Sequence, residues 1–130
     1  MCISIVLINI INAFPVNATF AAAITGVTIT LCAVMYVDDT DLVITGRRHD
    51  DFEKVTEDAQ ALARKWCDTL RITGGALRPD KCWWFSVSFK WLPDGSWRYA
   101  SIEETPGDIE IPDYRMETEK IERVKVTEGR

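Results

Sequence analysis

The first 37 residues of this 130-residue chain contain no Asp, Glu, Lys, Arg or His. All fifteen Lys/Arg and all twenty Asp/Glu residues therefore lie from Asp38 onward. An uncharged stretch of this length is typical of a transmembrane or signal segment, but no basic residue precedes it, and asparagines and Pro15 interrupt its apolar runs. A membrane or secreted protein directed by residues 3–35 is the minority alternative to an intracellular protein of the cytoplasm or nucleus.

Residues that bind zinc or form recognisable redox motifs are also scarce. The four cysteines, Cys2, Cys32, Cys67 and Cys82, include no Cys-x-x-Cys pair, and the single histidine, His49, is not at a zinc-ligand spacing from any of them. This pattern argues against a zinc module and favours reduced thiols in an intracellular protein.

An excess of positive charge is missing as well. The net charge is −5 and the pI about 4.9, whereas domains that bind nucleic acid are usually basic because they neutralise phosphates. Apolar residues make up 47% of the chain, as in ordinary globular proteins. The length suffices for one domain with a modest core. Any role with nucleic acid must therefore rest on a specific site.

The first half of the chain predicts a β-hairpin. Residues 3–24 form an apolar segment that we expect to be buried, and its structure stays open between helix and strand up to residue 26. The β-branched run 27–37 predicts a strand, 38–41 a polar tip, and 42–45 a returning strand closed by a glycine.

A long amphipathic helix is predicted after this hairpin. Asp50 or Asp51 supplies an N-cap, and Gly74–Gly75 ends the helix. Apolar residues recur between them at spacings of three and four, which predicts one buried face. These residues are Phe52, Val55, Ala59, Leu62, Trp66 and Leu70.

An aromatic hairpin follows the helix. Residues 81–91 predict a strand, Pro93–Ser96 has turn chemistry, and 97–99 form the partner strand. Its aromatics are either core or cross-strand pairs or a platform on which bases stack. Packing is favoured by roughly three to one, with one exposed face as the candidate primer-side surface. From residue 101 the chain becomes charged; 109–111 predict a short strand and 121–126 an edge strand.

The segment Tyr36-Val37-Asp38-Asp39 carries the clearest chemical signal. Two carboxylates at a hairpin tip suit Mg²⁺, with Mn²⁺ as the alternative ion, because hard cations prefer oxygen ligands held by rigid elements. Neighbouring side chains of a strand point to opposite faces, so we expect Asp38 to be the main ligand and Asp39 a secondary one. The alternative is a solvated turn, but Tyr-x-Asp-Asp arises by chance in only about one in a hundred chains of this size at ordinary residue usage.

The segment 33–43, Ala-Val-Met-Tyr-Val-Asp-Asp-Thr-Asp-Leu-Val, resembles the catalytic hairpin of reverse transcriptases. The following helix, the stretch Gly-Gly-Ala-Leu-Arg-Pro-Asp-Lys-Cys at 74–82 and the aromatic hairpin match that family in order, so the similarity covers residues 30–100. It is closest to the reverse transcriptases of retroelements. The resemblance implies an α+β fold in which an antiparallel palm-like sheet, with the Tyr-x-Asp-Asp hairpin, is packed by a long helix.

The same resemblance divides the chain into an apolar segment 1–26, a partial palm domain 27–100 and a charged extension 101–130 that is partly disordered or truncated. It implies metal-dependent nucleotidyl transfer by an RNA-directed DNA polymerase, with dNTPs and an RNA or DNA primer–template as partners of the full-length ancestor.

Individual residues take roles from the family. Asp38 and Asp39 would be catalytic metal ligands, and Tyr36 and Val37 would lie at the substrate. Lys81 is either a catalytic lysine that assists departure of pyrophosphate or an ordinary exposed lysine. The family needs a third aspartate on an earlier strand, but no acid precedes Asp38. We therefore expect a fragment that is inactive without the missing polymerase segments, with a non-catalytic retroelement remnant as the alternative.

Overall fold

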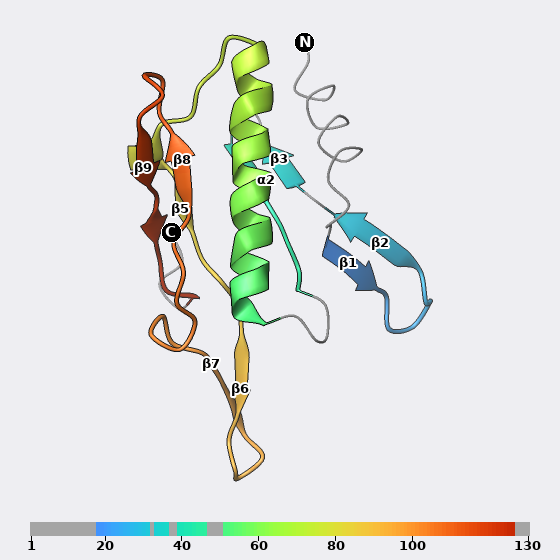
Figure 1. Cartoon of the computed structure of the whole chain (residues 1–130). Coiled ribbons are helices and arrows are strands. Elements are labelled where there is room, and N and C mark those ends of the chain that lie inside the picture. Colours follow the sequence, from blue (N-terminus) through green and yellow to red (C-terminus); the bar gives the residue numbers. More distant parts are fainter. Residues whose placement is uncertain (1–17, 32, 37–38, 47–50, 127–130) are drawn as a thin grey trace. The chain divides into compact units, whose positions relative to one another are not determined.

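A computed structural model of the chain describes residues 18–31, 33–36, 39–46 and 51–126 (Figure 1). This part is α+β, with one α-helix and short strands that associate in five two-stranded pairs. Four of the pairs are antiparallel and one is parallel. The chain divides into two compact units, residues 1–76 and 77–130.

The first unit contains two antiparallel hairpins. In one, β1 (Ala18–Ala21) pairs with β2 (Thr28–Leu31), and in the other, β3 (Ala33–Tyr36) pairs with β4 (Asp39–Leu42). The single strand predicted over 27–37 is therefore wrong. Its β-branched residues do form strands, but β2 and β3 belong to different hairpins, and β-propensity does not determine which partner a strand takes.

Residues 21–30 are exposed, so the prediction of burial up to residue 24 is wrong where the structure describes side chains. Gly26, at φ 66°, and a hydrogen bond from its N–H to the Ala22 carbonyl (2.9 Å) turn the chain between β1 and β2. The earlier residues of the apolar segment lie outside the described part.

The polar tip is shorter than predicted. Asp39 already pairs with Tyr36, and the strand continues through Thr40 and Asp41 to Leu42. The prediction of a returning strand over 42–45 is wrong, because β4 begins three residues earlier and ends at Leu42. A two-stranded hairpin with a solvated face accepts polar residues in its strands, so polarity did not mark the strand end here.

The predicted helix is present as α2 (Phe52–Ile72). Asp51 is its N-cap, and its carboxylate accepts a hydrogen bond from the Lys54 N–H at 2.9 Å. Leu62 and Trp66 of the predicted apolar face are buried, and the other four members are half-buried. The three-and-four spacing therefore identified two of the buried residues of α2, whereas Cys67 and Thr69, which are also buried, lie outside the predicted set.

The end of α2 has the geometry of a Schellman motif. Gly74 has φ 83°, which L side chains rarely adopt. Its N–H donates to the Arg71 carbonyl, and the Gly75 N–H donates to the Leu70 carbonyl at 3.0 Å. The prediction that the two glycines end the helix is confirmed.

The aromatic hairpin is the best-predicted part of the second unit. β6 (Phe89–Trp91) pairs with β7 (Trp97–Tyr99) in antiparallel register. Gly95 has φ 82°, and the Asp94 carboxylate accepts hydrogen bonds from both the N–H and the hydroxyl of Ser96. The turn chemistry of 93–96 thus closes the hairpin as predicted.

The single strand predicted over 81–91 is wrong. A 3₁₀ turn, η1 (Pro79–Lys81), comes first, followed by β5 (Trp83–Trp84) and, after a gap, β6. Pro79 at the first position of η1 presets the helical φ, and its carbonyl accepts from the Cys82 N–H at 3.1 Å. Pro79 thus favours a 3₁₀ turn here, although the apolar pattern of 81–91 predicted a strand.

Residues 101–126, expected to be a partly disordered or truncated extension, contain three strands. β8 (Glu110–Pro112) and β9 (Thr118–Lys120) form a hairpin, and β10 (Glu122–Arg123) pairs in parallel with β5. Figure 1 shows β8 and β9 side by side. Ile109 and Ile111 are buried. A short strand at 109–111 is thus confirmed within a residue, whereas the strand at 121–126 is limited to β10.

α2 carries charged side chains along its length, and no helix within the described ranges is long and apolar enough to cross a membrane.

Candidate metal-binding hairpin

The Tyr-x-Asp-Asp motif lies at the chain reversal between β3 and β4. Tyr36 is the last residue of β3 and Asp39 the first of β4, and their Cα atoms are partners in the register. Val37 and Asp38, the predicted substrate contact and main metal ligand, lie outside the described residues. Asp41, further along β4, is exposed. Backbone pairing on both sides therefore fixes the position of the motif along the hairpin.

The donor set of this hairpin suits a hard divalent cation. Mg²⁺ is commonly held by one or two carboxylates and keeps several of its waters, so adjacent aspartates at a reversal match its needs. Arrangements with two ions need more carboxylates, and the sequence has none before Asp38. By residue type alone, Asp38 and Asp39 would supply part of the carboxylate set of a two-metal site.

Lys81 is the last residue of η1 and is exposed. It belongs to the second unit, whereas Asp39 belongs to the first. Next to it, Arg78 donates two hydrogen bonds to the Asp80 carboxylate, at 3.1 and 2.6 Å. The Arg78 hydrogen bonds hold the pKa of Asp80 below its usual value. No described contact assigns a chemical role to Lys81.

The aromatics of the second unit pack against one another and yet remain exposed. The Phe89 ring lies 5.5 Å from that of Tyr99 and 5.3 Å from that of Trp97. The prediction of cross-strand pairs is confirmed for Phe89, Trp97 and Tyr99, which lie on an exposed face with exposed fractions from 38% to 56%, whereas Trp84 is half-buried. The opposite side of the hairpin carries polar contacts, in which Lys90 and Arg98 form ion pairs with Glu104.

Sequence reasoning missed the cluster around Arg123. Its guanidinium lies 4.5 Å from the Trp84 ring centre and donates to Ser86 Oγ (2.9 Å), to Thr105 Oγ1 (2.7 Å) and to the Thr105 carbonyl. Burial lowers the pKa of Arg123. A hollow of about 290 Å³ adjoins the cluster, lined by residues of the segments 99–103 and 123–126 and by Ser86. The arginine joins β10 to β5 and to the turn at 101–105. In the sequence, the alternation of apolar and charged residues over 121–126 was the pattern that could have pointed to this cluster.

An acidic cluster occupies the turn of the β8–β9 hairpin. Carboxylate oxygens of Asp113, Glu117 and Glu119 lie within 4.8 Å of one another. The Asp113 carboxylate already accepts from the N–H groups of Arg115 (2.7 Å) and Glu117 (2.9 Å), and Met116 has φ 72°. Glu117 and Glu119 are exposed. These contacts explain the cluster as turn stabilisation, and we assign no metal to it.

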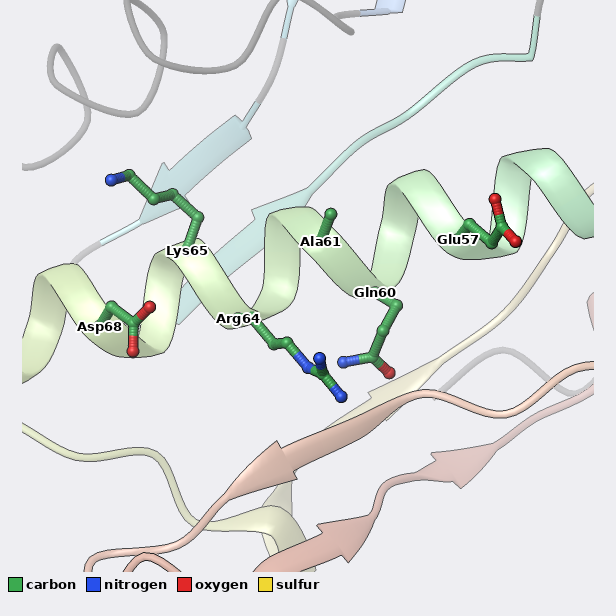
Figure 2. Close-up of a pocket in the computed structure, with 6 residues that line it drawn as sticks. All are labelled: Glu57, Gln60, Ala61, Arg64, Lys65 and Asp68. Atoms are coloured by element: carbon green, nitrogen blue, oxygen red, sulfur yellow. The ribbon is translucent and has the colours of Figure 1, made fainter.

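A shallow hollow over α2 has no features of a binding site. Figure 2 shows its six lining residues, all of which come from this one helix. Five of them are exposed and one is half-buried, and charged side chains predominate. They are Glu57, Gln60, Ala61, Arg64, Lys65 and Asp68.

Comparisons with protein-family models, with curated proteins and with solved structures find no match to this chain.

Proposed function

We propose that the chain is a fragment of a reverse transcriptase palm, in which Asp38 and Asp39 supply carboxylate ligands for Mg²⁺ or Mn²⁺. The observation that carries the proposal is the register of β3 with β4, in which Tyr36 opposes Asp39. That register brings the Tyr-x-Asp-Asp motif to the reversal of a paired hairpin, where a metal-dependent polymerase needs its carboxylates.

The chemistry would be nucleotidyl transfer. A divalent ion at the hairpin would align the primer hydroxyl with a nucleoside triphosphate and stabilise the leaving oxygen. In this chain Asp38 and Asp39 would hold the ion, and Tyr36 and Val37 would border the incoming nucleotide. The primer–template and dNTPs would be engaged only together with the polymerase segments that lie outside this chain.

The alternative is a non-catalytic remnant of such a polymerase. Without an upstream aspartate, this chain supplies two of the three carboxylates that the resemblance requires. The two readings differ in what Asp38 does, because a remnant has no need to bind an ion there.

Metal titration distinguishes them. We expect Mn²⁺ to broaden the amide NMR signals of Tyr36 and Asp39 before others, and calorimetric affinity for Mn²⁺ to fall at least about tenfold in Asp38→Asn, since one of two carboxylate ligands is lost. Asp68→Asn, the same change at an exposed position of α2, is the matched control and should bind as the unaltered chain does.

Two results would contradict the proposal. Equal Mn²⁺ affinity of Asp38→Asn and Asp68→Asn would support the remnant. Broadening that begins at the acidic turn around Asp113 would place the ion there instead.

A further inference from the structure

The segment 83–91 has an unusual distribution of apolar residues. Its five odd-numbered residues are all large and apolar, and all are exposed. Across the hairpin, Trp97 and Tyr99 join them through ring contacts with Phe89 at 5.3 and 5.5 Å. We refer to this surface as the aromatic face; it consists of Trp83, Phe85, Val87, Phe89, Trp91, Trp97 and Tyr99.

Contacts on the other side of the segment keep the aromatic face turned outward. The even-numbered Trp84 and Ser86 contact Arg123, and Lys90 donates to Glu104 at 2.6 Å. Residues 85–88 belong to no strand, but exposed odd-numbered and half-buried even-numbered residues alternate from 83 to 88. Rotating the aromatic face inward would break all of these contacts. These contacts therefore fix the orientation of the aromatic face within the second unit.

The size of the face corresponds to a protein interface. On average about half of each of its side chains is exposed. A buried aromatic residue contributes about 150–250 Å², so the face offers roughly 500–800 Å². This exceeds most of the range of about 300–600 Å² for the largest apolar patch of a monomer and approaches the roughly 800 Å² that each partner buries in a stable complex.

Charge favours a second copy of the same chain as the partner. The aromatic face has no charged member, so two copies meet there without the repulsion that the net charge of −5 causes elsewhere. Lys81 precedes its first residue, and Asp94 lies in the turn beyond its last strand residue; both are exposed. When two faces run antiparallel about a two-fold axis, each Lys81 comes close to the Asp94 of the other copy.

Nucleic acid fits this face less well. The two basic residues of the β6–β7 hairpin, Lys90 and Arg98, form ion pairs with Glu104 at 2.6 and 2.7 Å on the opposite side. Binding of single strands combines stacking with a positive groove along the backbone, and the second of these features is missing from the face itself.

We propose that the aromatic face is the interface of a two-fold symmetric homodimer, in which the faces of two copies pack antiparallel and Lys81 pairs with Asp94 across the axis.

Sedimentation velocity of the full chain tests this. We expect a species of twice the 14.8 kDa chain mass at micromolar concentration. Trp91→Asp should raise the dimer dissociation constant at least tenfold, because it buries a charge at the most exposed residue of the face (72%). Tyr114→Asp alters an aromatic of similar exposure (68%) outside the face and should leave the dimer intact.

The outcomes separate the alternatives. Circular dichroism identifies any variant that has lost α2, and Phe85→Asp then replaces Trp91→Asp. A monomeric unaltered chain, or equal weakening by Trp91→Asp and Tyr114→Asp, would overturn the dimer. A monomer whose tryptophan fluorescence is quenched by single-stranded DNA would assign the face to nucleic acid instead.

Discussion

Glu104 accepts four hydrogen bonds within the second unit. Its carboxylate receives one from Lys90 Nζ (2.6 Å), two from the Arg98 guanidinium (both 2.7 Å) and one from the Ser101 N–H (2.9 Å). The Arg98 hydrogen bonds, followed by that of Lys90, hold the pKa of Glu104 well below its usual value. One side chain thereby ties both strands of the β6–β7 hairpin to the turn that follows.

The pH dependence of stability should change in Glu104→Gln. A carboxylate with a lowered folded pKa stabilises the fold above its unfolded pKa, about 4.3, and loses this effect as the pH falls further. We therefore expect the unaltered chain to melt at higher temperature than Glu104→Gln at pH 6, with the difference shrinking toward pH 2 in thermal unfolding followed by circular dichroism. Glu119→Gln, an exposed glutamate on β9, is the control. A difference that does not vary with pH would contradict the role of the charge.

At the scale of elements, the C-terminus of α2 depends on one backbone conformation. Gly74→Ala should destabilise the chain by about 1–2 kcal/mol, the cost of a left-handed conformation for an L residue. The added Cβ meets nothing within 4 Å, so the cost is conformational and not a clash. Urea unfolding measured by circular dichroism gives the value.

Gly75→Ala is the matched control for this change. Gly75 does not have a positive φ, and its added Cβ would meet the Leu70 carbonyl oxygen at an ordinary 3.5 Å. A smaller loss is expected there. Equal losses at the two positions would show that φ is not the cause.

Elements with strong local signals could be predicted from the sequence. α2 has a capping aspartate, a periodic apolar face and terminal glycines, and β6–β7 has a Pro-Asp-Gly-Ser turn, so each is specified within a short stretch of chain. The division of 27–37 between two hairpins depends on pairing with 18–21, which no local pattern reveals. The Arg123 cluster depends on contacts with Thr105 and Ser86, which lie 18 and 37 positions before Arg123 in the chain. No local sequence pattern reveals these contacts either.

The candidate site was predictable only as a motif. A hairpin around Tyr36–Asp39 was predicted, and the backbone confirms it, with β4 beginning three residues earlier than the polar run suggested. Whether its carboxylates bind an ion depends on residues outside any short window, and so it stays a prediction.

At the scale of the whole molecule, the two carboxylates of Asp38 and Asp39 and a net charge of −5 are not sufficient for polymerase activity. We expect no template-dependent incorporation in a primer-extension assay with the isolated chain, Mg²⁺ or Mn²⁺ and dNTPs, because the third carboxylate and the basic surface that grips phosphates are both lacking. Asp38→Asn serves as the control for contaminating polymerase. Incorporation by the unaltered chain that Asp38→Asn abolishes would overturn the expectation of inactivity.

The parallel pairing of β5 with β10 has a consequence for the order of folding. It joins residues 83–84 to 122–123, whereas the β6–β7 and β8–β9 hairpins that lie between them in sequence are closed by short turns. Closing a long loop loses more chain entropy than closing a short one, and contacts of high sequence separation form slowly. During synthesis both hairpins can therefore form first, and the second unit is completed only when Arg123 has left the ribosome and reached Trp84.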